Sequence, residues 1–276
     1  MSVKAVKLKV LQIGINMKIH YLGTCSGTEP MHGMHHTSLV IETGDSLDWF
    51  DAGENCAHTA YTSGIEVMKT RAIFISHPHI DHTGGLANLL SLFAKIERRY
   101  GKKLIKDNSL TLFFPGLKVF DAVKTVALGS ENNSTFRYSI EEREIFDGLL
   151  YEDENIKVSS IHNGHLGEDG SLGWHSFSFL IEAEGKRAVY SGDVASSLEL
   201  DPIIGKCDLL IHETGHHKAE DVMKYAYEKG VKSLVFTHHG RAIIEDRNNV
   251  QKVVDKFGER YHLPTLIAYD GFSNEI

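Results

Sequence analysis

Four residues that can bind metal ions lie within six consecutive positions, directly after the apolar run at 72–75. They are His77, His79, Asp81 and His82. Imidazole nitrogens and carboxylate oxygens are the usual protein ligands of zinc and of neighbouring divalent metals. The first two histidines alternate on an extended backbone and can face one ion, whereas the last two residues lie where the chain turns and can face a second. A solvated polar loop is the alternative, but this spacing predicts a metal site.

Two metal ions that share a water need about seven or eight ligand bonds, which is more than this stretch provides. Further candidates follow other predicted strands, namely His162 and His165, Asp193, and His238 and His239. Each is weak on its own, because a histidine at the end of a strand is usually an ordinary surface residue. Together they would supply the ligands that residues 77–82 alone cannot provide for a binuclear site. The sequence leaves open which member of each histidine pair is the ligand.

The segments that must position these side chains are strands and helices. Apolar and β-branched runs predict strands at 18–22, 38–42, 46–50, 71–76, 110–114, 156–161, 176–182, 187–190, 208–212, 233–236 and 265–269. Helical periodicity predicts helices at 85–100, 117–128, 220–229 and 245–257. The first half of the chain is predicted to consist mainly of consecutive strands, whereas helices occur between the strands of the second half. This order favours an α/β fold with four αββα layers, in which two mixed β-sheets pack face to face between outer helices.

No repeat, low-complexity tract or linker divides the sequence, so we expect residues 1–276 to form one domain. Residues 1–16 are either an N-terminal extension or the product of an alternative start. The stretch 130–154 is rich in Asn, Ser and Glu. It is either a surface excursion or a lid over the site.

The composition is that of an ordinary globular protein, with 42% hydrophobic and 24% charged residues. A formal net charge of −8 argues against a nucleic-acid-binding protein held by its overall field. Residues 95–106 are an exception, with six bases and one acid, and form either a solvated helix end or a phosphate-backbone patch. Three cysteines at unrelated spacings predict no disulfide framework, and no apolar run is long enough to span a bilayer. We therefore expect a cytoplasmic protein without a membrane partner.

The order and spacing of the motifs resemble the metallo-β-lactamase-fold hydrolases over nearly the whole chain. The stretches that carry the resemblance are 21–27, 51–54 and 77–82. It implies that His165, Asp193 and His238 are the third, the bridging and the final metal ligands. It also implies two divalent metal ions, with Zn²⁺ expected and Mn²⁺ or Fe as alternatives.

Within that superfamily the chain is most similar to the ribonuclease Z-like branch, which cuts tRNA 3′ trailers, and to its phosphodiesterase relatives. The similar features are the glycine loop at 23–27, the Gly53-Glu54 pair and the sequence His212-Glu213-Thr214. The last of these resembles the His-Glu-Ala-Thr motif of that branch.

Two departures from that branch count against tRNA as the substrate. The tRNA-processing enzymes usually carry a protruding arm between the third ligand and the bridging aspartate. Here Asp193 follows His165 by only 28 positions, and the sequence between them is strand-like. Their final ligand also stands in a Thr-His-x-Ser-x-Arg-Tyr context, whereas residues 237–241 of this chain read Thr-His-His-Gly-Arg.

The resemblance implies roles for several of these residues. Asp81 would bind metal and hold the attacking hydroxide, which makes it the candidate general base. Asp51 would hydrogen-bond a ligand histidine and fix its tautomer, with a plain turn carboxylate as the alternative. His212 and Glu213 would protonate or orient the leaving group, or else they stabilise a loop.

Two further residues are candidates for contact with the substrate. His36 lies in the loop before the second predicted strand and either contacts substrate or is simply solvated. Arg241 would clamp a phosphate, because its planar guanidinium matches phosphate oxygens.

These features predict a binuclear metal-dependent hydrolase that cleaves a phosphodiester through a metal-bound hydroxide. The substrate would be a small phosphodiester, such as a cyclic nucleotide, or an RNA end. A ribonuclease Z-type tRNA 3′ endonuclease is one alternative. A thioester or lactone hydrolase and a non-catalytic metal-binding protein are the others, and a homodimer is left open.

Overall fold

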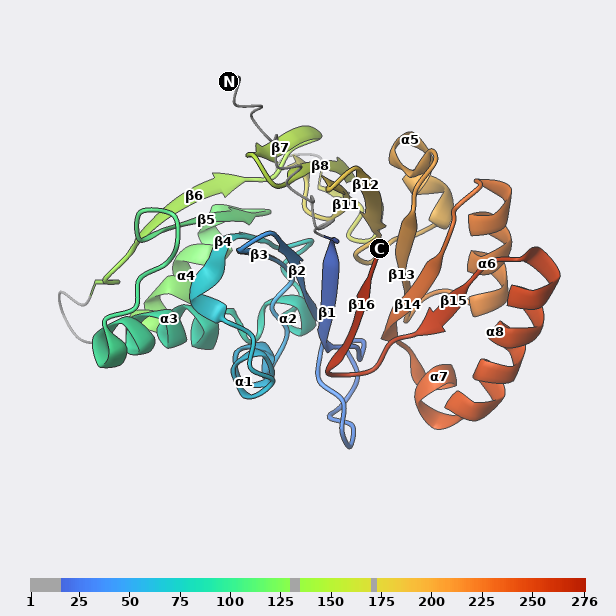
Figure 1. Ribbon diagram of the computed structural model, residues 1–276, viewed down its shortest axis with the longest axis horizontal. Helices are drawn as coiled ribbons and strands as arrows, with labels where there is room; N and C mark the ends of the chain where they lie inside the picture. Colours follow the sequence, from blue (N-terminus) through green and yellow to red (C-terminus); the bar gives the residue numbers. More distant parts are fainter. Residues whose placement is uncertain (1–15, 130–134, 170–172) are drawn as a thin grey trace, which may run out of the picture.

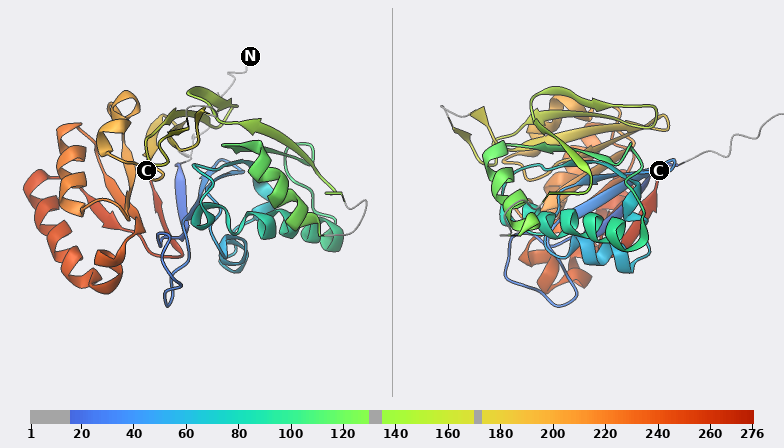
Figure 2. Two further views of the ribbon diagram at one scale, coloured as in Figure 1. Left: turned by 180° about the vertical axis from the view of Figure 1, so that it is seen from behind. Right: turned by 90° about the vertical axis from the view of Figure 1, so that its left-hand side faces the viewer.

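Two seven-stranded β-sheets pack face to face in the computed structural model, which describes residues 16–129, 135–169 and 173–276 (Figure 1). Helices lie on the outer face of each sheet (Figure 2). The predicted four-layer αββα sandwich of two mixed sheets is therefore confirmed. The possible N-terminal extension lies, up to residue 15, outside the described ranges.

The first sheet has the strand order β16 (Phe272–Glu275), β1 (Lys18–Gly23), β2 (Ser38–Thr43), β3 (Ser46–Phe50), β4 (Thr70–Phe74), β5 (Ser109–Phe114) and β6 (Ser139–Glu144). The second has the order β15 (Thr265–Ile267), β14 (Leu234–His239), β13 (Leu209–Thr214), β12 (Lys186–Tyr190), β11 (Phe177–Ala183), β8 (Lys157–His162) and β7 (Gly148–Glu152). Each sheet combines three antiparallel and three parallel pairings. A separate ribbon pairs β9 (Glu168–Asp169) with β10 (Gly173–Trp174).

The helices are α1 (Cys56–Thr62), α2 (Ile80–Thr83), α3 (Leu86–Tyr100), α4 (Leu117–Leu128), α5 (Asp201–Ile204), α6 (Ala219–Glu228), α7 (Arg241–Glu245) and α8 (Arg247–Tyr261), with short 3₁₀ turns at Val67–Lys69 and Ser197–Leu200. The longer ones are amphipathic. On α3, the buried side chains recur at helical spacing and face the first sheet, namely Leu86, Leu89, Leu90, Phe93 and Ile96. Burying one such side chain contributes about 1.5–3 kcal/mol.

An aromatic cluster fills the space between the two sheets. Phe74 stacks on Phe50 and on Phe113, with ring centroids 5.0 and 4.8 Å apart. From the second sheet, Phe179 meets Phe50 edge to face at 5.4 Å. These contacts join the sheets, and they fix the position of β4, the strand that leads into the motif at 77–82.

The predicted strands and helices are present, with ends that differ by a few residues. The main difference lies in the stretch 130–154, where no element was expected. Its described part contains β6 and β7, which are edge strands of the first and the second sheet. The chain therefore crosses between the sheets here, and the described part of this stretch is neither a surface excursion nor a lid. Residues 130–134 are outside the described ranges.

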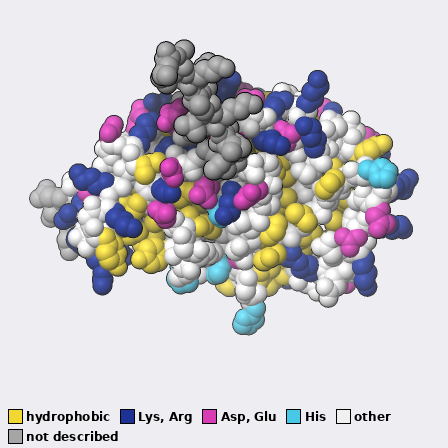
Figure 3. All heavy atoms as spheres, viewed as in Figure 1, with side chains coloured by type: hydrophobic (Ala, Val, Ile, Leu, Met, Phe, Trp, Pro, Cys, Tyr) yellow, Lys and Arg dark blue, Asp and Glu magenta, His cyan; other side chains and the backbone are white. Residues whose placement is uncertain are grey.

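Charges of both signs are mixed on the face shown in Figure 3, where Lys and Arg side chains alternate with Asp and Glu. The three cysteines are buried and unpaired. Among the helices of the described ranges, none combines the length and the apolar character needed to cross a bilayer.

Candidate metal centre

Strand ends from both sheets bring the predicted ligands to one edge of the sandwich. The loop after β4 and the short helix α2 carry residues 77–82. From the second sheet, His165 lies in the loop after β8, Asp193 follows β12, and His238 is the penultimate residue of β14. The ends of parallel strands are the usual place for a binding site in an α/β fold.

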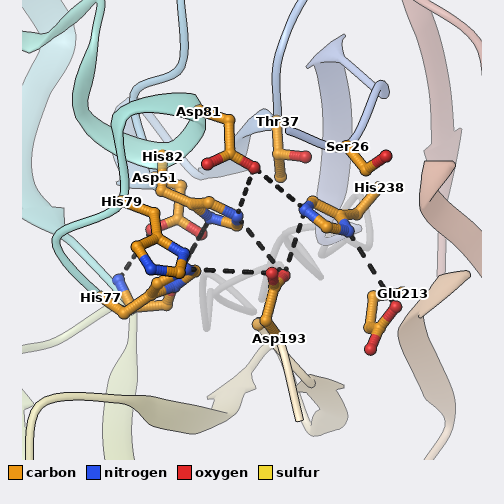
Figure 4. Close-up of polar contacts among 12 residues, drawn as sticks. Ser26, Thr37, Asp51, His77, His79, Asp81, His82, Asp193, Glu213 and His238 are labelled. Atoms are coloured by element: carbon orange, nitrogen blue, oxygen red, sulfur yellow. Dashed lines mark hydrogen bonds and ion pairs between the residues drawn. The ribbon is translucent and has the colours of Figure 1, made fainter. Parts of the chain in front are cut away.

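All seven predicted ligands lie close together, in two groups. All of them except His165 are labelled in Figure 4. We call the first the histidine group; it consists of His77, His79 and His165. The second, which we call the acidic group, consists of Asp81, His82, Asp193 and His238. Within each group, every residue offers one ligand atom, and these atoms lie within 4.8 Å of one another.

The histidine group brings three imidazole rings together. The His77 ring lies 4.7 Å from that of His79 and 4.8 Å from that of His165, measured between centroids. Burial, assisted by the neighbouring histidines, holds the pKa of His77 well below its ordinary value. Burial also lowers the pKa of His165. Unprotonated rings keep the nitrogen lone pairs that coordinate a metal ion.

The acidic group surrounds one point with alternating nitrogen and oxygen atoms. His238 Nε2 lies 3.2 Å from Asp81 Oδ2 and 3.3 Å from Asp193 Oδ1. His82 Nε2 lies 3.4 Å from each of the same two oxygens. Burial opposes ionisation of Asp193, but the charges of His238 and His82 outweigh it and hold its pKa below the usual range. Two ionised carboxylates in a buried cluster require a compensating cation.

Asp193 connects the two groups through its two carboxylate oxygens. Oδ2 faces the histidine group, at 3.8 Å from His77 Nε2 and 3.6 Å from His165 Nε2. Oδ1 faces His82 and His238 in the acidic group. The carboxylate thus lies between the groups, as Figure 4 shows, and has the placement of a bridging ligand.

Several buried ligand atoms lack hydrogen-bond partners among the described residues. They include His77 Nε2, His82 Nε2 and Asp193 Oδ1. Leaving a buried polar atom unsatisfied costs about 1–3 kcal/mol, so three of them at one place call for a physical explanation. Divalent metal ions would satisfy all three, and the nitrogen and carboxylate donors suit zinc and its neighbours. The residues present therefore fit a metal centre.

Asp51 supports the acidic group from behind. Its Oδ2 accepts hydrogen bonds from His82 Nδ1 at 2.7 Å and from the Tyr190 hydroxyl at 2.6 Å, and its Oδ1 accepts one from the Ser76 amide at 2.7 Å. This places the proton of His82 on Nδ1 and leaves Nε2 facing the acidic group. The backbone φ is 60° at Asp51 and 47° at His238, so both residues are left-handed. Residues other than glycine in this conformation often occur at functional sites.

Glu213 and His216 lie beside His238, and sequence reasoning missed the second of them. Glu213 Oε2 is 4.0 Å from His238 Nδ1 and accepts a hydrogen bond from the His216 amide at 2.8 Å. The half-exposed His216 ring places Nδ1 3.2 Å from Glu213 Oε1 and 3.9 Å from Asp193 Oδ2. The hydrogen bond to Glu213 raises the pKa of His216. Its position just after a strand is the signal that could have identified it.

His212 is not placed to act on a leaving group. Its ring is fully buried, Nε2 lies 3.0 Å from the Ser197 hydroxyl, and Nδ1 lies 2.7 Å from the backbone oxygen of Glu213. Burial lowers the pKa of His212 to about 4. Both ring nitrogens are thus engaged inside the protein, and the contact with Ser197 links β13 to the 3₁₀ turn at Ser197–Leu200.

His36 and Arg241 also have partners within the protein. His36 Nε2 lies 3.1 Å from the Thr28 backbone oxygen, a contact that stabilises the loop between β1 and β2. Arg241 is exposed and forms ion pairs with Glu29 and, at 3.3 Å, with Glu245. Arg241 as placed is therefore not a free phosphate clamp.

The structure separates the members of the two histidine pairs that the sequence could not. His162 shares hydrogen bonds with Asp147 and stacks on Trp174, with centroids 4.0 Å apart. His239 is buried, with Nδ1 3.0 Å from the Thr214 hydroxyl and Nε2 2.9 Å from the Ala268 oxygen. Among the described residues, neither of these two histidines belongs to the cluster, whereas His165 and His238 lie within it.

Comparison with known proteins places the chain among hydrolases of this architecture. Residues 17–239 match the family described as Anti-Pycsar protein Apyc1. Ribonuclease Z from Thermoplasma acidophilum is 26% identical over 301 aligned positions, which cover 92% of this chain and 96% of that protein. The solved structure of the metallo-β-lactamase-fold protein YhfI from Bacillus subtilis superposes with a TM-score of 0.71, at 18% identity, over 95% of this chain and all of YhfI. Human tRNase Z, short form, gives a TM-score of 0.67 at 19% identity, over 94% of this chain and 98% of that chain.

Proposed function

The chain belongs to the family of the anti-Pycsar protein Apyc1, and from this premise we propose that it uses two divalent metal ions to cleave a small phosphodiester such as a cyclic nucleotide. It has the metallo-β-lactamase fold and is a metal-dependent hydrolase related to ribonuclease Z and to phosphodiesterases. The observation that carries the proposal is the set of buried ligand atoms without partners at the centre of the two groups.

The ligand roles follow from the geometry of the two groups. The histidine group would hold one ion. Asp81, His82 and His238 of the acidic group would hold the second ion, and Asp193 would be shared between the two ions. When bound, two such ions would bring the pKa of a shared water towards neutrality and polarise the phosphate ester. We take zinc as the expected metal, with manganese or iron as alternatives.

The chain's own residues would orient the reactants and move the protons. Asp81 lies at the solvent side of the acidic group, with 5% of its surface exposed, and would accept the proton of the attacking water. His216 would replace His212 as the proton donor to the leaving oxygen, because Glu213 holds its Nδ1 and leaves Nε2 available. Tyr190 and Ser76 would keep Asp51 in place behind His82.

The experiment is an activity screen of protein reloaded with Zn²⁺ or Mn²⁺. The substrates are bis-p-nitrophenyl phosphate, cyclic nucleotides, a lactone, a thioester and a precursor tRNA. We expect turnover of the phosphodiesters and about two ions per chain by elemental analysis. Turnover of only the lactone or thioester would overturn the phosphodiester assignment, and fewer than about one ion per chain after reloading would overturn the binuclear one.

A ribonuclease Z-type activity is the second candidate, because the Thermoplasma relative of that name aligns over 96% of its length. The segment between His165 and Asp193 favours a small phosphodiester over tRNA as the substrate. Half of its described part belongs to β11 and β12 of the second sheet, which are joined by a short turn. Efficient, strongly salt-dependent trimming of precursor tRNA would decide for the ribonuclease.

We also propose that residues 1–276 act as one cytoplasmic domain. The support is that the acidic group takes His82 from α2, which follows β4 of the first sheet, and His238 from β14 of the second, so neither half of the sandwich would carry the site alone.

A further inference from the structure

We infer that Glu199 is a positioning residue, whose carboxylate holds His165 at the metal centre and thereby sets the affinity of the ion at the histidine group. This inference rests on the two-ion arrangement of the proposed function and adds to it a residue outside the ligand set. Glu199 lies in the 3₁₀ turn at Ser197–Leu200, and its side chain is partly exposed. In the described ranges it belongs to neither ligand group.

The second sheet does not itself join the loops that carry His165 and Asp193. His165 follows β8 and Asp193 follows β12, and β11 lies between these two strands. The ends of β8 and β12 therefore share no ladder of backbone hydrogen bonds. The metal centre nevertheless brings the two ligands close together, because His165 Nε2 lies 3.6 Å from Asp193 Oδ2. A contact outside the ladder is needed to hold this distance.

The carboxylate of Glu199 provides such a contact, because it accepts hydrogen bonds from both loops. Its Oε1 accepts one from the Gly164 amide at 2.9 Å, and its Oε2 accepts one from the Ala195 amide at 3.0 Å. Each of these amides lies within two positions of a predicted metal ligand. Hydrogen bonds to an ionised acceptor are roughly twice as strong as those between neutral groups. One side chain thus ties the two ligand-bearing loops together.

Gly164 gives the carboxylate the room that this contact requires. A Cβ atom on Gly164 would lie 2.7 Å from Glu199 Oε1. Gly164 is not among the glycines with a positive φ, so its backbone conformation is open to other residues. An alanine at this position would therefore displace the carboxylate without straining the backbone.

The loop of His165 depends on Glu199 more than the loop of Asp193 does. Asp193 is buried, and the backbone oxygen of the residue after it lies 3.0 Å from His217 Nε2, which approaches from another loop. His165 is only partly buried, and Asn163 anchors the start of its loop to β11. Loss of the Glu199 carboxylate should therefore release His165 and leave Asp193 in place.

The test measures the affinity of each ion by stepwise Zn²⁺ competition with a chromophoric chelator. Glu199→Ala removes both acceptor oxygens, whereas Gly164→Ala displaces the carboxylate. We expect each variant to weaken one ion about 10-fold or more and to leave the other within about twofold. In an Asp81→Ala background, which lacks a ligand of the acidic group, Glu199→Ala should weaken the remaining ion by the same factor.

The matched control is Ser196→Ala, which acts on the same 3₁₀ turn. It removes the side-chain cap, in which Ser196 Oγ accepts from the Leu198 amide at 3.3 Å, and keeps the carboxylate of Glu199. Both ions should stay within about twofold of the unsubstituted protein. An effect of Ser196→Ala equal to that of Glu199→Ala would assign the result to the turn as a whole and overturn the inference.

A double-mutant cycle tests whether Gly164 and Glu199 act through one contact. Once Glu199→Ala has removed the carboxylate, Gly164→Ala has nothing left to displace. We therefore expect the double variant to weaken the ion by less than about twofold more than Glu199→Ala alone. Two fully additive effects would show that the substitutions act by separate routes, which would overturn the inference.

Hydrogen exchange of metal-free protein gives a readout that needs neither metal nor turnover. The Gly164 amide should lose its protection in Glu199→Ala and keep it in Ser196→Ala, because its acceptor is removed only in the first. This loss, together with the weakening of one ion, supports the inference even if no phosphodiester is cleaved and the proposed function fails. Unchanged affinity for both ions in Glu199→Ala, or equal weakening of both, overturns the inference, and phosphodiester turnover by the unsubstituted protein would still uphold the proposed function.

Glu199→Gln repeats the test should Glu199→Ala fold poorly. The glutamine keeps the length of the side chain but only one acceptor oxygen, so it can accept from Gly164 or from Ala195 and not from both. We expect it to weaken the same ion as Glu199→Ala, by a smaller factor. Wild-type affinity for both ions in this variant would likewise overturn the inference.

Discussion

The histidine group and the acidic group lie side by side but differ in burial and in charge. His79 is exposed and His165 is partly buried, whereas all four members of the acidic group are buried. A cation at the acidic group would be held by two carboxylates and two histidines, and one at the histidine group by three histidine nitrogens and the shared carboxylate of Asp193. The acidic group therefore needs a cation for its charge balance, whereas the histidine group remains accessible from solvent.

The largest effect should come from removing the carboxylate that faces the reacting water. We predict that Asp81→Ala lowers turnover by about 1,000-fold or more, because one substitution removes both a metal ligand and the proton acceptor. The histidine group would be intact, so the variant should stay folded and retain about one ion per chain. Elemental analysis and circular dichroism, run beside the kinetics, check these three expectations.

The matched control for this variant is Asp45→Ala, because the Asp45 side chain is 97% exposed and, within the described ranges, pairs only with Lys69. It should retain wild-type turnover and both ions. If Asp81→Ala also keeps wild-type turnover, Asp81 has no part in the mechanism. If it instead loses both ions, the two groups do not bind metal independently.

A smaller effect should follow when a support of the acidic group is weakened. Asp51→Asn keeps the shape of the side chain but replaces one acceptor oxygen with a donor, so it cannot accept from both the Ser76 amide, which now donates to Oδ1, and His82 Nδ1, which donates to Oδ2. Changes of this kind typically cost 10- to 100-fold in metal affinity or activity. Competition with a chromophoric chelator should show the weakening for one ion and not the other. Equal weakening of both ions would contradict the division into two groups.

Removing the metal should also lower stability, since the acidic group would then keep two buried carboxylates without their cation. Ions present at about 100 times their dissociation constant stabilise a fold by about 2.7 kcal/mol. For a chain of this size we expect chelation to lower Tm by about 5–10 °C. Calorimetry before and after chelation, with recovery on adding Zn²⁺, checks this. An unchanged Tm would mean that the acidic group is balanced by protons instead of metal.

The two groups also differ in how far the sequence reveals them. Residues 77–82 stand together after an apolar run, so residue types and spacing were sufficient to find them. His165 and His238 could not be told from His162 and His239, because both members of each pair follow a strand. What separates them is tertiary contact, such as Asp147 beside His162 and Ala268 beside His239.

The fold shows the same division between local and distant information. Strongly apolar strands such as β4 could be predicted from their composition. In contrast, no residue of β6 is buried, and its sequence therefore has little apolar pattern to detect. The four-residue strand β16 is defined by pairing with β1, about 250 positions earlier in the chain, which a local pattern does not contain. His216 likewise gains its importance only when the loop after β13 folds towards Asp193.

The smallest effect should come from the basic cluster, which lies far from both groups. α3 begins next to the metal-binding loop, where the Gly85 amide donates to the Ala52 oxygen, and a rise of 1.5 Å per residue places its last turn about 20 Å away. We predict that neutralising four exposed bases changes kcat/KM for a small phosphodiester by less than about twofold, with weak salt dependence, because few long-range contacts are screened. The four are Arg98, Arg99, Lys102 and Lys103. Kinetics at low and physiological salt, with precursor tRNA in parallel, provide the measurement. Efficient tRNA trimming that collapses in this variant would mean that the cluster grips RNA in place of the missing arm, and that both groups serve a ribonuclease.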